Sequence, residues 1–150
     1  MELYRAVGVW PGLDATLIQQ AAAEGDPGDG PSVAITIGTA YLRTAVPFLR
    51  VNSGLEDQFL ATPSGLWGTA FSNVPQLLVG TLTIWESGDA AADYMKSGAH
   101  GAAVAAHFDP KKDPTGHTFV TGGGFLGFRP LSSRGSVAGK NPISPECLSL

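Results

Sequence analysis

Two histidines seven residues apart are the strongest candidates for chemistry in this chain. His100 and His107 both lie in the stretch SGAHGAAVAAHF. Imidazole titrates near neutral pH, so either side chain could remove a proton from a substrate, and a neutral ring nitrogen could also bind iron. Seven residues are nearly two turns of an α-helix, so the two side chains are expected on one face of a helix.

The continuity of that helix decides where this face points. In an unbroken helix that begins at Ser87, the apolar stripe directed at the core would comprise Ala91, Tyr94, Met95, Gly98 and Ala102. Both histidines would then face solvent. A kink near Ser97 and Gly98 would instead turn them inward, and glycine makes such a kink possible. The sequence leaves both alternatives open.

Aromatic and amide side chains could complete a binding site around the histidines. Trp85, at the end of a strand, and Tyr94 could wall a cavity and stack on a flat, conjugated ligand. Trp67 and Phe71, on the preceding strand, are further candidates for contact with a substrate. Asn52 could orient a substrate or dioxygen, because an amide donates a hydrogen bond without carrying charge. Each aromatic residue also has a purely structural interpretation as part of the core, and Asn52 could mark a helix irregularity.

The hydrophobic pattern predicts the elements that must position these residues. In chain order we expect a strand over 32–42, a helix over 44–62, strands over 65–72 and 76–87, a helix from 87 through both histidines, and a strand within 117–131. This order predicts an α+β, ferredoxin-like split βαβ sandwich, with two helices on one face of a four-stranded antiparallel sheet. Either Thr81, Thr83 and Trp85 or Leu82 and Ile84 would lie on the opposite face, which would need a partner.

Both flanks of this domain differ from it in composition. Residues 1–30 are expected to form an N-terminal extension with one helix, capped by Asp14 and ended by Gly25, followed by a linker rich in Gly, Pro and Asp. Residues 31–130 then form the domain. Residues 131–150 are rich in Ser, Gly and Pro and predict an irregular tail.

Composition narrows the classes of function and location. The net charge of -4 argues against a nucleic-acid partner, because such binding needs clustered Lys and Arg. No apolar run approaches the ~20 residues that a membrane-spanning helix needs, and the first residues lack a signal peptide pattern. The single cysteine, Cys147, favours a reducing compartment, so we expect a cytoplasmic protein. The histidines and Cys147 are not at the spacing of a zinc site.

Two stretches carry a resemblance to a known family. PFLRVNSGLEDQFLATPSGLWGTAF and LTIWESGDAAADYMKSGAHGAA resemble the dimeric α/β-barrel superfamily, which includes antibiotic-biosynthesis monooxygenases, haem-degrading monooxygenases and spheroidene-monooxygenase-like proteins. The likeness covers about residues 33–128. It implies a homodimer in which the open faces of two sheets close an apolar chamber.

The resemblance also implies a function. A protein of this kind is expected to be a monooxygenase-type oxidoreductase that acts on a hydrophobic, conjugated small molecule. With haem as cofactor, His100 would be the first candidate for the axial ligand and His107 the second, and no other metal site is expected. Without a cofactor, the substrate itself must activate oxygen, while the protein positions and desolvates it. The alternative is a non-catalytic module of the same fold that binds a small ligand or serves a stress response.

Overall fold

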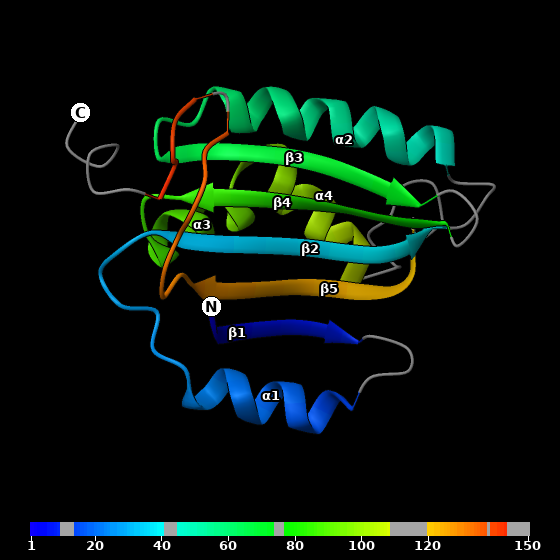
Figure 1. The fold of residues 1–150 in the computed structure, drawn as a ribbon. Coiled ribbons are helices and arrows are strands. Elements are labelled where there is room, and N and C mark those ends of the chain that lie inside the picture. The colour runs from blue at the N-terminus through cyan, green and yellow to red at the C-terminus, as the bar shows by residue number, and fades with distance from the viewer. Residues whose placement is uncertain (10–13, 41–44, 74–76, 109–119, 138, 144–150) are drawn as a thin grey trace.

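The computed structural model describes residues 1–9, 14–40, 45–73, 77–108, 120–137 and 139–143. Within them a five-stranded antiparallel sheet has the order β1-β5-β2-β4-β3 (Figure 1). The strands are β1 (Glu2–Val9), β2 (Ser32–Ala40), β3 (Gly65–Asn73), β4 (Leu78–Trp85) and β5 (Val120–Arg129). The helices are α1 (Ala15–Glu24), α2 (Ala45–Leu60), α3 (Gly88–Lys96) and α4 (Gly98–Phe108). The predicted α+β ferredoxin-like fold is confirmed, with one additional strand.

Strand register settles which side chains of the sheet meet the helices. Ala34 of β2 lies opposite Thr83 of β4, and Thr36 lies opposite both Thr81 and Phe125. Residues directly opposite each other in a ladder point to the same face of a sheet. Ala34 and Phe125 pack in one cluster with Ala91 and Tyr94 of α3. The set that contains Thr81, Thr83 and Trp85 therefore faces the helices, and Leu82 and Ile84 point away from them.

Trp85 is the centre of the core between the sheet and the helices. Its side chain is 1% exposed, and its indole Nε1 donates a hydrogen bond of 2.8 Å to Thr83 Oγ1. The ring of Phe59, from α2, meets it edge-on at 5.1 Å, and the ring of Tyr94, from α3, lies 4.8 Å away. Edge-to-face and tilted contacts of this kind stabilise aromatic pairs beyond the area they bury. Trp85 thereby joins β4 to two helices.

The N-terminal segment is built into the sheet. The predicted helix is confirmed as α1, whose Asp14 cap accepts hydrogen bonds from the amides of Thr16 and Leu17. Strand β1 was not anticipated; it pairs with β5 along its whole length. The Tyr4 hydroxyl lies 2.6 Å from the hydroxyl of Ser32, which is fully buried at the start of β2. The division into an extension, a domain and a tail stays a prediction.

The sheet face turned away from α3 and α4 is partly covered. Ile18 and Ala22 of α1 pack with Ala6 at the β1 edge. Figure 1 shows the segment after β5 crossing the sheet near the start of β2 and the end of β4. On the same face of the sheet, Phe71 is 37% exposed and Leu82 is half-buried, so neither α1 nor the segment after β5 covers these side chains completely. None of the helices in the described part of the chain is long and apolar enough to cross a membrane.

The helix that begins after Ser87 is not continuous through both histidines. It is broken between α3 and α4, which is the alternative with a kink near Ser97 and Gly98. α3 ends at Lys96 and Ser97 caps it, its amide donating to the Tyr94 carbonyl. α4 begins at Gly98, whose φ of +51° lies in the left-handed region that glycine adopts without strain. The change of direction between the two helices is therefore encoded at this glycine.

The Tyr4–Ser32 contact predicts that β1 contributes to global stability. Tyr4→Phe should lower the free energy of unfolding by about 1–2 kcal/mol, because it leaves the buried Ser32 hydroxyl without its partner. Urea denaturation of Tyr4→Phe, Ser32→Ala and the double variant measures the coupling. The double variant should lose less than the sum of the two single losses. Strict additivity would show that the two hydroxyl groups do not stabilise the fold through one another.

Candidate functional site

The helix break directs His100 toward the interior. Its Nδ1 lies 3.3 Å from the Met95 carbonyl oxygen, in the last turn of α3. Its ring lies 4.8 Å from the ring of Tyr94, at an interplanar angle of 50°. Both contacts are made by residues that precede the break, so the turn at Gly98 folds the histidine back against α3.

The contact with Met95 sets the protonation state of His100. A carbonyl oxygen only accepts, so Nδ1 must carry the hydrogen and donate it. Burial lowers the pKa of His100 below its ordinary value of 6.5, because the charged ring is poorly solvated; the bond to the Met95 carbonyl acts in the opposite direction. At neutral pH the ring is therefore neutral, with Nε2 free of hydrogen. Such a nitrogen can accept a proton or bind a metal.

His100 lines a cavity of about 600 Å³ between the sheet, α2 and α4. Its floor includes five helix-facing positions of the sheet that carry small side chains: Ala34, Thr36, Gly38, Gly68 and Ala70. Small residues leave the pleated surface shallow, which makes room for a ligand to lie against it. A cavity of this size, mostly apolar with a few polar groups, has the character of a small-molecule site.

A row of aromatic rings forms one wall of this cavity. Phe59, Trp85, Tyr94 and His100 follow one another at centroid distances of 5.1, 4.8 and 4.8 Å. The Tyr94 hydroxyl donates to the Leu55 carbonyl of α2 at 2.8 Å. Burial raises the pKa of Tyr94 to about 12, so the phenol stays neutral. The aromatic wall is therefore uncharged at neutral pH. The hydrogen bond from Tyr94 of α3 to Leu55 joins it to α2.

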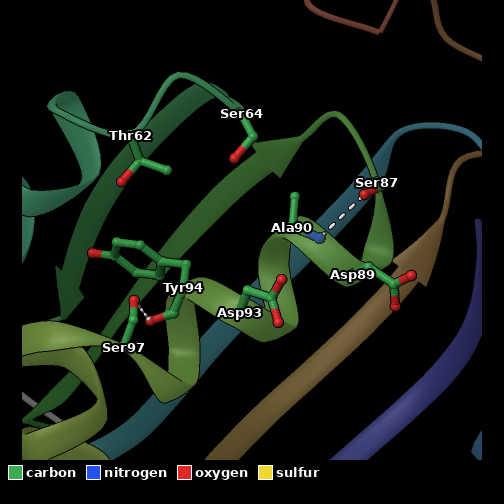
Figure 2. A pocket seen from close by; sticks show the side chains of 8 residues that line it. All are labelled: Thr62, Ser64, Ser87, Asp89, Ala90, Asp93, Tyr94 and Ser97. Atoms are coloured by element: carbon green, nitrogen blue, oxygen red, sulfur yellow. Dashed lines mark hydrogen bonds between the residues drawn. The ribbon is translucent and has the colours of Figure 1, made fainter.

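Tyr94 also borders a second, polar hollow of about 470 Å³. Figure 2 shows it between the start of α3 and the loop that leads into β3, with the Ser87 hydroxyl accepting from the Ala90 amide. Asp89 and Asp93 are both exposed there. Asp89, in the first turn of α3, is explained by the helix dipole, and Asp93, in the second half of α3, by its exposure to solvent. Nowhere in the described chain do three His, Cys, Asp or Glu residues gather as a metal site would require.

The structure brings together some of the residues singled out from the sequence. Trp85, Tyr94 and His100 line the 600 Å³ cavity. Trp67, on the outer strand β3, also borders it, but Trp67 lies opposite Ile84, so its side chain is directed to the other face of the sheet. Phe71 is on that same opposite face, where its ring covers Gly80. Asn52 belongs to α2 and His107 to α4, but their side chains fall outside the described residues.

Sequence reasoning missed one residue beside the site. The side-chain amide of Gln58, on α2, reaches the start of α4 and accepts a hydrogen bond of 3.2 Å from the His100 backbone amide. No local pattern marks Gln58, because its partner lies 42 residues further along the chain.

Known structures share this fold. Rv0793 from Mycobacterium tuberculosis superposes with a TM-score of 0.55 at 8% identity, over 70% of this chain and 99% of its own. A mutant of SnoaB, a cofactor-independent oxygenase from Streptomyces nogalater, gives 0.51 at 11%, over 71% and 97%. A putative antibiotic biosynthesis monooxygenase from Nitrosomonas europaea gives 0.51 at 8%, over 76% and 97%. No family model and no curated protein matches the sequence. At these identities the similarity establishes the fold.

The buried, neutral His100 predicts a loss of stability in mild acid. Because its folded-state pKa is lower than in the unfolded chain, the unfolded state binds the proton more tightly. The free energy of unfolding should therefore fall as the pH decreases below about 6.5, until the folded-state pKa is passed. Urea denaturation between about pH 7.5 and 5 should show this slope in the wild type and a smaller slope in His100→Gln. Equal slopes would contradict the burial of a neutral ring.

Proposed function

We propose that this protein is a cofactor-independent, monooxygenase-type oxidoreductase that acts on a hydrophobic, conjugated small molecule. The observation that carries the proposal is His100, which lines the apolar cavity with Nδ1 bound to the Met95 carbonyl and Nε2 free to accept a proton. A base with a pKa near or below neutral is suited to removing an acidic proton from carbon or oxygen.

Deprotonation is the step that this site would promote. A conjugated substrate with an acidic methylene group becomes an electron-rich anion once His100 takes its proton, and such an anion can itself reduce dioxygen. The overall change is R₂CH₂ + O₂ → R₂C=O + H₂O, in which the substrate supplies all four electrons and one oxygen atom leaves as water. The protein then contributes a base, a fixed orientation and exclusion of bulk water.

The shape of the cavity supports a flat substrate. The small residues on the sheet floor and the aromatic row of the wall offer two surfaces on which a conjugated ring system can pack. Asn52 lies on α2, earlier in the helix than Phe59. We propose its side chain as a hydrogen-bond donor to the substrate or to dioxygen. The similarity in fold to SnoaB, itself a cofactor-independent oxygenase, supports the reaction class.

The cavity suits haem less well than a neutral substrate. His100 offers a nitrogen for an axial ligand, but a porphyrin also carries two propionates that need cationic partners. Among the described residues that line the cavity, Lys96 is the one cation, and Glu56 adds a negative charge. Burial of a dianionic ligand with so little compensating charge would be costly. No step of the proposed reaction passes through iron.

We also propose that the protein forms a homodimer through the open part of its sheet. Phe71 and Leu82 lie on the face that α1 and the segment after β5 leave uncovered. Apolar side chains that gather on one exposed face of a sheet can form the contiguous patch that a partner covers. A second copy is the partner that the resemblance to dimeric α/β barrels implies.

The catalytic proposal predicts the behaviour of His100→Gln with anthrone as probe. Anthrone is a flat tricyclic ketone whose methylene proton is acidic, and its oxidation to anthraquinone is followed by absorbance and by oxygen uptake. The wild type should accelerate this reaction over buffer, and His100→Gln should lose on the order of 10²–10⁴-fold in kcat. Asp93→Asn, a change at an exposed carboxylate of α3, should retain the wild-type rate.

Two outcomes would contradict this assignment. If His100→Gln oxidises the probe as fast as the wild type, His100 is not the base. If the wild type binds anthrone, measured by quenching of tryptophan fluorescence, and consumes no oxygen above buffer, the protein is a binding module of the same fold.

The dimer proposal predicts an effect of charge at Phe71. Phe71→Arg should convert a dimer to a monomer in light scattering coupled to gel filtration, because two identical faces would each bury an unpaired cation. Leu17→Arg, at an exposed position of α1, should leave the mass unchanged. A wild-type monomer at concentrations of about 100 μM would refute the dimer, since a stable interface is expected to persist there.

A further inference from the structure

Gln58 makes the contacts that join α2 to the break between α3 and α4. Its Oε1 accepts from the His100 amide at 3.2 Å, and its Nε2 donates to the Ser97 carbonyl at 3.3 Å. A Cβ added to Gly98 would lie 2.9 Å from Oε1 and 3.1 Å from Nε2. The amide therefore lies directly over the left-handed glycine, and a side chain at that position would have to displace it.

The break needs such a partner because it interrupts the helical hydrogen bonds. The first amides of α4 have no acceptor within their own helix, as at any helix start. A side chain at the N-cap usually supplies one acceptor, but the Ser97 hydroxyl donates to the Tyr94 carbonyl of α3. Gln58 supplies the acceptor for His100 from a different helix. Its amide thus replaces a capping side chain and ties the first turn of α4 to α2.

The same helix α2 is held rigidly at this point. The Tyr94 hydroxyl donates to the Leu55 carbonyl, one turn before Gln58. The Thr62 hydroxyl donates to the carbonyl of Gln58 itself at 2.8 Å, one turn after it. Phe59, the next residue, packs edge-on against the buried Trp85. Gln58 therefore projects from a segment whose position is fixed on both sides.

We propose that Gln58 is the positioning residue of the site, which holds the first turn of α4 so that the His100 ring stays in the cavity with Nδ1 on the Met95 carbonyl. This inference rests on the proposed function of His100 as a base. Gln58 is absent from the described lining of the cavity and acts only through His100. Without the amide, the first turn of α4 is free to shift, the bond to Met95 weakens, and the hydrogen redistributes between the two ring nitrogens.

Nuclear magnetic resonance of Gln58→Leu tests this directly and needs no substrate. At about pH 8, where histidine is neutral, the ¹⁵N shifts of the wild type should report the Nδ1–H form of His100, and those of Gln58→Leu a mixture of both forms. The His100 backbone amide should exchange with solvent roughly tenfold faster in the variant. Gln20→Leu is the matched control, because this α1 glutamine donates a hydrogen bond to Glu24 at the surface, far along the chain from the helix break.

The wild type alone can also refute the proposal. Its His100 amide belongs to the first turn of a helix and should nevertheless exchange at least tenfold more slowly than in an unfolded chain. An unprotected amide in the wild type, or an unchanged tautomer and exchange rate in a folded Gln58→Leu, would overturn the assignment.

Turnover of anthrone separates this inference from the proposed function. Gln58→Leu should lower kcat about tenfold and leave KM within about twofold, because the base is displaced while the cavity wall persists. A tautomer change in Gln58→Leu together with an inactive wild type would refute the catalytic function and leave the positioning intact. A fall in kcat without a tautomer change would refute the positioning role and leave the catalytic function intact.

Discussion

The break between α3 and α4 is the constraint on which the site depends. Its left-handed residue, Gly98, ends one helix and starts the next in a new direction, so the two helices no longer share one buried stripe. His100 would face solvent in a continuous helix; here it contacts Met95 and Tyr94. Its lowered pKa and its single hydrogen on Nδ1 both follow from that placement.

Core and cavity share the same side chains. Trp85 is nearly inaccessible to solvent, yet it contributes to the wall of the cavity together with Phe59 and Tyr94. The small residues opposite them leave volume unfilled, which costs stability in proportion to the space left empty. Under the proposed function, this space beside a neutral histidine is a compromise between dense packing and a binding site. The aromatic contacts to α2 and α3 offset part of this cost.

The segment before β2 changes the surface that the fold presents. β1 extends the sheet beyond β5, and α1 covers the β1 edge on the face away from the cavity through Ile18 and Ala22. Covering an edge in this way protects its unpaired backbone groups. Among the described strand residues of that face, Phe71 is the large hydrophobic side chain that remains exposed, which indicates where a second copy could pack.

The sequence by itself determined most of the elements and their order. Alternating β-branched residues marked β2, and the caps Asp14 and Ser87 marked two helix starts, because these signals lie within a few neighbouring residues. β1 escaped notice because a short edge strand has little pattern of its own and is defined by its pairing with β5. Gly98 only permitted a kink, and the direction of His100 was decided by tertiary structure. Gln58 and the Met95 carbonyl meet that histidine only after α2 and α3 have packed, and no local pattern encodes a contact between residues 42 positions apart.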